Sequence, residues 1–281
     1  MPLSAALAAI GDPGPVHRTR AVGGGCISRA QQIVTARGRY FLKTGASRTF
    51  EVEARGLALL RAAEALPIPR VLAVDDGQEG QDGYLLLEWV EPATAESGWG
   101  RRLGQGLAAL HREVGASFGL DHDNFIGANP QSNGWDVSWI DFYRDQRLRA
   151  QESLAEREGR WSATRRKRLD RICDRLEALI GTLEAPALLH GDLWSGNVLL
   201  SAHHGPMLID PAVYYGDPEA DIAMTTLFGG FPRDFYDAYG DLRPGWETRR
   251  DLYNLYHLMN HLNLFGEGYG GQVDAILGRY S

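Results

Sequence analysis

The sequence His190-Gly191-Asp192-Leu193-Trp194-Ser195-Gly196-Asn197 is followed, thirteen residues after its end, by Asp210 in Ile209-Asp210-Pro211. Each polar group lies beside a short apolar run: residues 187–189 precede the stretch, residues 198–200 follow it, and residues 207–209 lead into Asp210. Short apolar runs bounded by turn-forming residues are typical of β-strands. The pattern therefore predicts that two carboxylates and one amide are presented beside strands.

These residue types at this spacing indicate phosphoryl transfer. Asp192 is the expected general base, because a carboxylate within hydrogen-bond reach can accept the proton of an attacking hydroxyl. Asn197 and Asp210 offer the oxygen ligands that Mg²⁺ prefers. The structural alternative is an aspartate in a turn, an asparagine in a turn and a loop-capping aspartate. We favour a kinase-type site that uses ATP and Mg²⁺.

The chain has an organisation that suits such a site. Residues 1–90 are expected to form strands at 16–22, 27–36, 39–43, 71–74 and 84–89, with one helix at 50–65 and Gly23-Gly24-Gly25 between the first two strands. From residue 91 the pattern is mainly helical, with helices expected at 99–114, 136–158, 161–183, 218–228, 232–239 and 246–265. The sequence predicts an α+β fold with two lobes, 1–90 and 91–281, around a cleft.

Residues 190–197, taken with Pro211-Ala212-Val213-Tyr214-Tyr215-Gly216-Asp217, resemble the fructosamine/ketosamine kinase family. That family belongs to the aminoglycoside-phosphotransferase branch of the protein-kinase-like fold, and the resemblance runs from Gly23 to Phe231. It implies an N-lobe with a five-stranded antiparallel sheet and one helix, and a mainly helical C-lobe. It also implies ATP-dependent phosphorylation of the third-carbon hydroxyl of ketosamines, which are sugars attached to amines, free or on protein lysines.

Lys43 closes a predicted strand and is expected to contact the phosphates of the nucleotide. The helix beginning at Phe50 resembles the helix of the family that carries the partner of this lysine. The resemblance favours Glu53 as that partner, with Glu51 as the rival. The alternative is that all three are solvated surface residues.

Gly23, Gly24 and Gly25 would let backbone N–H groups approach phosphates, and Ser28 could add a hydroxyl. A glycine run between strands is more often a simple hairpin, so this signal depends on Lys43. Cys26 lies in the same loop, where neighbouring N–H groups could lower its pKa, and we consider a redox role beside that of an inert small residue.

The remaining nucleotide and loop assignments follow from the fold that the resemblance implies. In such folds the segment that joins the lobes offers backbone groups to adenine, here from Glu88 and Val90. His190 is expected to support the catalytic loop rather than transfer protons, and Asp221 to brace that loop or to cap a helix.

For the acceptor, Trp194 is the preferred platform for a sugar ring, with Trp135 as a second aromatic candidate, although core packing explains most aromatic residues. Asp217, together with Glu219 and Glu267, is expected to bind the acceptor's amine. Further polar candidates are Asn124, Asn129, Gln131, Asn133 and Arg147.

The composition argues against several other classes of function. A net charge of -7 argues against nucleic-acid binding, and no apolar run is long enough to span a membrane. Two cysteines and an N-terminus without a basic leader favour a cytoplasmic protein. We expect a monomer or weak dimer. The alternatives are a kinase for an aminoglycoside, plain sugar or amino alcohol, a metal hydrolase built on His190, Asp192, His203, His204 and Asp210, and a nucleotide-binding pseudokinase.

Overall fold

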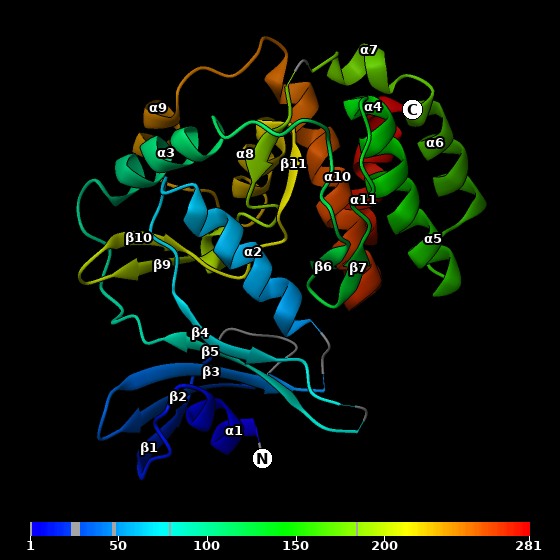
Figure 1. Cartoon of the computed structure of the whole chain (residues 1–281). Helices are drawn as coiled ribbons and strands as arrows, with labels where there is room; N and C mark the ends of the chain where they lie inside the picture. Colours follow the sequence, from blue (N-terminus) through cyan, green and yellow to red (C-terminus); the bar gives the residue numbers. More distant parts are fainter. Residues whose placement is uncertain (1, 24–28, 47–48, 79, 184) are drawn as a thin grey trace.

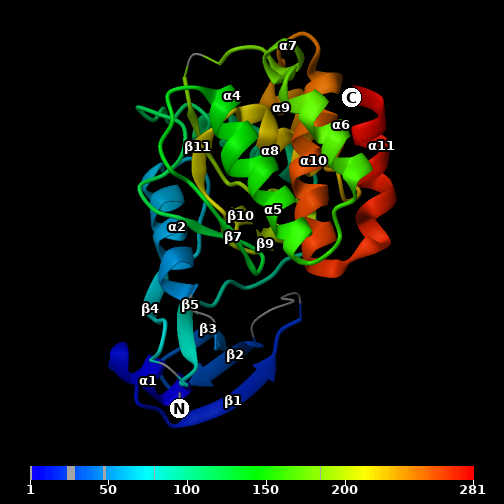
Figure 2. The same cartoon turned by 90° about the vertical axis from the view of Figure 1, so that its right-hand side faces the viewer.

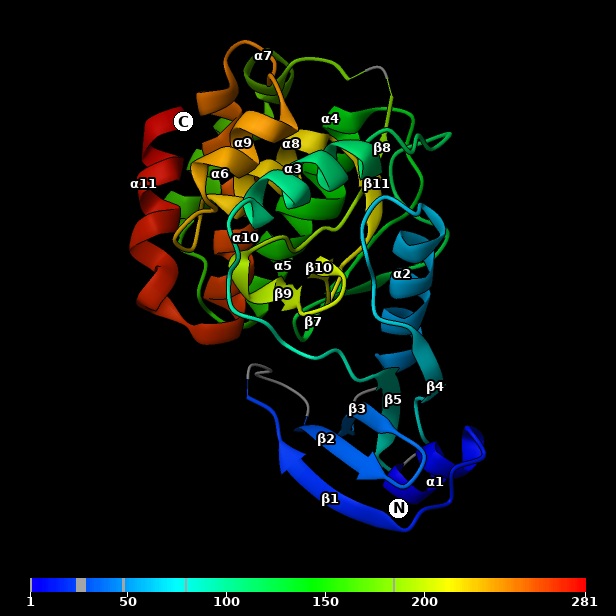
Figure 3. The same cartoon turned by 90° about the vertical axis from the view of Figure 1, so that its left-hand side faces the viewer.

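The computed structural model describes residues 2–23, 29–46, 49–78, 80–183 and 185–281. An antiparallel sheet lies at one end of the molecule and most of the helices at the other (Figure 1). Views from both sides show the same division, with the N-terminus beside the sheet and the C-terminus among the helices (Figures 2 and 3). The sheet has five strands in the order β1-β2-β3-β5-β4: β1 (Val16–Ala21), β2 (Arg29–Thr35), β3 (Arg39–Gly45), β4 (Val71–Asp75) and β5 (Gly83–Glu88).

The alternation of side chains gives the sheet two different faces. Leu42 and Leu86 face each other across β3 and β5 and pack with Leu7 of α1 (Pro2–Ala9). Lys43 and Leu85, the next cross-strand pair, therefore point to the opposite face. On that face Leu85 joins the cluster formed with α2 (Phe50–Ala62), so the pleat directs Lys43 toward α2.

The rest of the described chain is mainly helical and carries three small two-stranded antiparallel sheets, two of them hairpins. The central element is α10 (Trp246–Phe265), which packs against α5, α8 and α11 and is buried along most of its length. The other elements are α3 (Trp99–Leu110), α4 (Trp139–Phe142), α5 (Ala150–Arg157), α6 (Ala163–Cys173), α7 (Leu176–Ile180), α8 (Pro218–Thr225), α9 (Arg233–Tyr239) and α11 (Gly270–Tyr280), with the pairs β6 (Asn124–Ile126) and β7 (Asn129–Gln131), β8 (Ala187–Leu189) and β11 (Tyr214–Gly216), and β9 (Val198–Ser201) and β10 (Gly205–Leu208).

The expected α+β class and five-stranded antiparallel sheet are confirmed. Two expected helices are interrupted: 136–158 contains a π-helical segment at Tyr143–Arg149, and 161–183 divides into α6 and α7. Helices α1 and α11 were not predicted. Within the described residues, no helix combines the length and the hydrophobicity that a membrane span requires.

Candidate active site

A cavity of about 530 Å³ opens between the sheet and the helical region. Its walls come from the sheet, from α2, from the segment after β5, from the stretch that holds Asp192 and Asn197, and from the end of α10. Lys43, Asp192, Asn197 and Asp210 all line it. Lys43 and Asp210, which are 167 positions apart in the chain, therefore share one site.

A glycine and an aspartate shape the loop that carries Asp192. Gly191 has φ +83°, and a Cβ atom there would lie 2.0 Å from the carbonyl oxygen of Ala212, so only glycine fits. Asp221 accepts hydrogen bonds from the backbone N–H groups of His190 (2.7 Å) and Gly191 (2.8 Å). It also contacts His111 Nε2 at 3.2 Å. Asp221 thus fixes the loop from behind and does not reach the cavity lining.

His190 is fully buried beneath this loop, and its tautomer can be assigned from its partners. Its Nε2 lies 2.9 Å from the carbonyl oxygen of Ile209 and must donate, while its Nδ1 accepts from the backbone N–H of Asp192. Burial lowers the pKa of His190, although Asp221 opposes that effect. The ring is therefore neutral, and it links the strand ends that carry Asp192 and Asp210.

Asp192, Asn197 and Asp210 meet at the cavity wall. Asn197 Nδ2 donates to the carbonyl oxygen of Asp192 (2.8 Å), to Asp192 Oδ2 (3.1 Å) and to the carbonyl oxygen of Asp210 (3.4 Å). Asp210 has φ +52°, one of two non-glycine residues with positive φ in the described chain. A non-glycine residue in the left-handed region carries strain that often marks a functional site.

The carboxyl group of Asp192 has an unusual environment. Burial raises its pKa to about 7, opposed by the hydrogen bond from Asn197 and assisted by the negative charges of Asp210 and Asp221. A carboxylate with a pKa near neutrality is a much better proton acceptor than an ordinary surface aspartate.

Lys43 Nζ lies between two carboxylates. It is 2.6 Å from Glu53 Oε1 and also forms an ion pair with Asp210. Burial alone would lower the pKa of Lys43, but Glu53 and Asp210 raise it above its ordinary value. Burial raises the pKa of Glu53, and Lys43 opposes that effect. The structure thus pairs Lys43 with Glu53, while Glu51 is exposed and its backbone N–H bonds to Asp76.

Trp194 also lines the cavity, two residues after Asp192. Its indole lies over Gly196, where a Cβ atom would come within 2.3 Å of the ring. The indole and the ring of Phe228 meet edge to face, with ring centroids 5.9 Å apart. A glycine at 196 is therefore needed for the indole to occupy this position.

The structure places the other nucleotide candidates as follows. Gly23, Glu88 and Val90 line the same cavity as Lys43. Gly24, Gly25, Cys26 and Ser28 lie outside the described residues.

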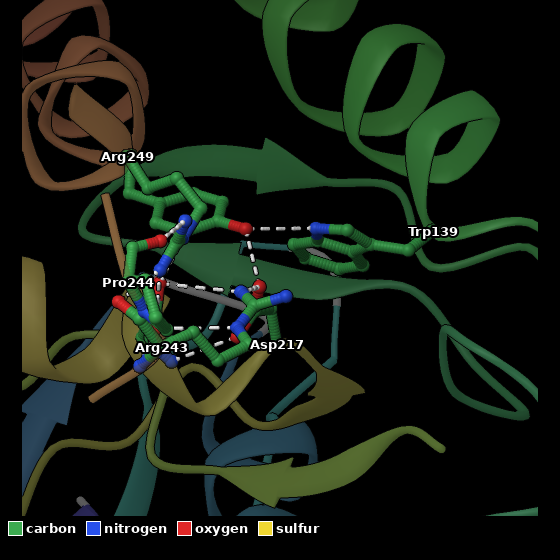
Figure 4. A network of polar contacts seen from close by, with 7 residues as sticks. Trp139, Asp217, Arg243, Pro244 and Arg249 are labelled. Atoms are coloured by element: carbon green, nitrogen blue, oxygen red, sulfur yellow. Dashed lines mark hydrogen bonds and ion pairs between the residues drawn. The ribbon is translucent and has the colours of Figure 1, made fainter. Parts of the chain in front are cut away.

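Two expected acceptor residues are not brought to the cavity. Asp217 is 1% exposed and caps α8 through the backbone N–H of Glu219, with Arg243 and Tyr253 as its side-chain partners. Figure 4 shows these groups in one closed network that also includes Arg249. Asp217 has no free oxygen facing an acceptor, so its expected role as an amine ligand is wrong.

Trp135 is the second of them, and it lies on the surface instead. It is 52% exposed and its ring packs 6.4 Å from that of Tyr215, outside the lining of the cavity. The sequence pattern of clustered aromatic residues did not distinguish an exposed ring from a ring in the site.

The polar candidates between Asn124 and Arg147 form a buried network behind the cavity. Only Asn124 lines it, and its amide donates to the carbonyl oxygen of Val213. Gln131 and Asn133 both donate to Asn124 Oδ1. Arg147 is fully buried, donates to Asn133 and stacks 4.0 Å from the ring of Tyr214. These residues support the segment after Asp210 rather than contact an acceptor directly.

The end of α10 forms a part of the cavity that the sequence pattern did not predict. Asn260, His261, Leu264 and Phe265 line it, together with Phe125 from β6. A signal was present in the sequence: polar residues recur at 254, 257, 260 and 263 among the mostly apolar residues of the second half of α10, and the structure buries all four. Buried polar side chains in a helix need a partner or a function.

The alternative of a metal hydrolase lacks a site in the described chain. His203 and His204 lie in the turn between β9 and β10 and are exposed, whereas His190 is buried under the loop. In the ranges that the structure covers, no three His, Cys, Asp or Glu side chains are grouped as metal ligands.

The chain matches a family model and relatives of known sequence over nearly its whole length. The family model for fructosamine kinase matches residues 4–280. A "probable ketoamine kinase" from Lactiplantibacillus plantarum is 44% identical over 94% of this chain and 95% of its own length. A chloroplastic protein-ribulosamine 3-kinase from Arabidopsis thaliana is 37% identical over 94% of this chain and 83% of its own length.

Solved structures support the same assignment. A protein from Thermobifida fusca assigned as a fructosamine-3-kinase superposes with a TM-score of 0.87 and is 31% identical, covering 98% of this chain and 96% of its own. Aminoglycoside phosphotransferase APH(4)-Ia, in complex with AMP-PNP and hygromycin B, shares the fold with a TM-score of 0.67 at 18% identity, with 98% of both chains covered. From the cavity, its converging polar groups and these matches over nearly the whole length, the chain belongs to the fructosamine kinase family.

Proposed function

We propose that this chain is an ATP-dependent kinase that phosphorylates a sugar hydroxyl of ketosamines, with Asp192 as the general base. The observation that carries the proposal is the meeting of Asp192, Asn197, Asp210 and the Lys43–Glu53 pair at one cavity. A kinase site needs a base, oxygen ligands and a fixed cation at the phosphates, and these residues supply each of them.

ATP lies in the part of the cavity nearest the sheet. Val22, Ala30 and Leu87 offer apolar surface on one side, and Val198 and Ile209 on the other. The backbone groups of Glu88 and Val90 bind adenine, and Gly23 begins the loop over the phosphates. Residues 1–90 thus act mainly as the nucleotide lobe, and residues 91–281 supply the base and the acceptor pocket.

The donor set at Asn197 and Asp210 fits Mg²⁺. The nitrogen of the Asn197 amide is committed to Asp192, so its oxygen is the atom available as a ligand. The Asp210 side chain is 41% exposed and faces Lys43. Mg²⁺ takes one or two protein ligands and completes its shell with phosphate oxygens and water. When bound, the ion supplies charge neutralisation at the phosphates.

The chain's own residues perform the transfer as follows. Asp192 accepts the proton of the sugar hydroxyl as that oxygen forms a bond to the γ-phosphorus of ATP. The bond between the γ-phosphorus and the bridging oxygen breaks, and ADP leaves with its electron pair. Lys43, held by Glu53, places a positive charge where the phosphate charge lies. Trp194 offers an apolar face to the sugar ring beside the base.

A coupled assay tests the proposal. Purified protein with ATP, Mg²⁺ and a fructosyl-amine is expected to release ADP and to form a ketosamine phosphate detectable by mass spectrometry. Removal of divalent cations with EDTA should abolish turnover, and added Mg²⁺ should restore it. Hygromycin B, glucose and ethanolamine serve as competing acceptors. Efficient use of one of these, with no turnover of any ketosamine, would refute the proposed acceptor class.

The rate should depend on pH through Asp192. Its pKa of about 7 in the free protein means that the reactive, deprotonated form is lost as the pH falls below neutrality. Because kcat/KM reports the free enzyme, we expect kcat/KM to be constant above about pH 8 and roughly tenfold lower near pH 6. A profile that stays flat down to pH 5 would contradict Asp192 as the base.

We further propose a cytoplasmic protein that acts as a monomer or weak dimer on free or protein-linked ketosamines. Two cysteines are too few for a disulfide framework, and burial raises the pKa of the Cys173 thiol to about 11, which disfavours the reactive thiolate.

A further inference from the structure

A continuous series of rings leads from the catalytic stretch to the surface. Trp194 meets Phe228 edge to face, and the centroid of Phe228 lies 4.8 Å from that of His261. His261 in turn packs on Phe265 (5.5 Å) and Tyr269 (5.0 Å). Trp194, His261 and Phe265 line the cavity, and Phe265 is 53% exposed. The cavity therefore has an aromatic wall that begins beside Asp192 and ends in solvent.

Among the rings of this wall that line the cavity, His261 carries a nitrogen that can accept a hydrogen bond. Its Nδ1 lies 2.8 Å from the carbonyl oxygen of His257, one turn earlier in α10. A carbonyl oxygen only accepts, so Nδ1 carries the proton. In the neutral ring Nε2 is then a hydrogen-bond acceptor on a residue that lines the cavity. Burial lowers the pKa of His261, which favours the neutral ring.

The carboxylates of the described cavity wall are already engaged. Glu53 and Asp210 bind Lys43, and Glu88 accepts from the backbone N–H of Arg70. Asp192 is the base. Glu267, expected from sequence to bind an amine, instead forms a two-point ion pair with Arg165.

This inference rests on the proposed function. We infer that His261 Nε2 accepts a hydrogen bond from the acceptor's amine, and that the substituent on the other side of the amine extends past Phe265 toward solvent. In a ketosamine the amine is attached to the sugar's first carbon, a short distance along the molecule from the third-carbon hydroxyl. With that hydroxyl at Asp192 and the ring on Trp194, the amine extends along the aromatic wall. Aromatic faces also attract a cationic amine. The pocket therefore selects amine-bearing sugars through a neutral acceptor and rings rather than through a carboxylate.

The test compares His261→Phe and His261→Gln with the unaltered protein. Phenylalanine keeps the ring packing against Phe228 and Tyr269 but removes the acceptor nitrogen, whereas glutamine places an amide oxygen near the position of Nε2. We expect His261→Phe to raise the KM for fructosyl-lysine about tenfold, with the KM for ATP unchanged and kcat nearly so. His261→Gln should recover most of the loss.

Fructose serves as the matched acceptor without an amine, measured as a substrate or as a competitive inhibitor. His261→Phe should leave its binding unchanged, and His203→Phe, at the exposed turn between β9 and β10, should alter neither acceptor. An equal loss for fructose and fructosyl-lysine, or no recovery with glutamine, would overturn the inference and leave the proposed function intact. If the unaltered protein phosphorylated no ketosamine, the proposed function would fail and the inference with it.

Discussion

Replacing Asp192 by asparagine is expected to lower kcat by about 10³-fold while the protein remains folded and binds ATP. The amide has nearly the shape of the carboxylate and can still accept the hydrogen bond from Asn197 Nδ2. It cannot take up the proton of the acceptor hydroxyl. Steady-state kinetics with a fructosyl-amine, together with ATP binding by calorimetry, would separate loss of chemistry from loss of binding. Asp82→Asn, at an exposed position, is the matched control.

The same substitution should stabilise the fold. The folded-state pKa of Asp192, about 7, lies above the ordinary value of 3.8, so the unfolded chain releases this proton at lower pH. Stability is therefore lost as the pH rises from about 4 to about 7, and asparagine avoids that loss. At pH 8 we expect a gain of about 1–3 kcal/mol in the free energy of unfolding, which should vanish near pH 4. Less stability in Asp192→Asn than in the unaltered protein at pH 8 would contradict the burial argument.

The separation of Asp192, Asn197 and Asp210 in sequence was sufficient to predict that they converge. Each follows or precedes a short apolar strand, and strands β8, β9 and β10 hold these residues at adjoining ends. Local patterns of this kind are readable because a strand fixes where its end groups lie. The sheet was predicted from similar local signals, such as the apolar run Leu85-Leu86-Leu87 in β5 and the turn residues Asp75-Asp76-Gly77 between β4 and β5.

Asp217 shows what the sequence pattern could not reveal. An acidic residue near a catalytic stretch looks the same whether it faces a ligand or an arginine, and its partner Arg243 is 26 residues away. Its burial depends on how α8 packs against α10, a tertiary contact that no local pattern encodes. The same holds for Arg147, whose place among Tyr214, Phe142 and Tyr256 follows from the π-helical segment around it.

His261 lies between these two cases. The polar residues in the second half of α10 were visible in the sequence among apolar neighbours. Which of their side chains reach the cavity depends on how α10 packs in the folded protein. A helix that is buried all round carries no amphipathic stripe to indicate which side faces the site.

Replacing Lys43 by alanine is expected to reduce kcat/KM for ATP by about 10²–10³-fold. Lys43 is one of only two lysines in the chain, which otherwise uses arginine for its basic residues. Its compact ammonium fits between Glu53 and Asp210, where a planar guanidinium would need more room, so Lys43→Arg should also be impaired. The other lysine, Lys167, is exposed on α6 and provides the control Lys167→Ala. Activity of Lys43→Ala within threefold of the unaltered protein would exclude Lys43 from the phosphate site.

The chain offers a second matched pair in Glu53 and Glu51, two residues apart on α2. Glu53→Gln should lower kcat/KM about tenfold because it weakens the hold on the Lys43 ammonium, whereas Glu51→Gln, at an exposed position, should have little effect. If Glu53 acts only through Lys43, adding Glu53→Gln to Lys43→Ala should cause little further loss, and the two effects will be far from additive. Additive losses would mean that Glu53 contributes to the site independently. They would contradict the proposal that Glu53 acts by positioning Lys43 at the phosphates.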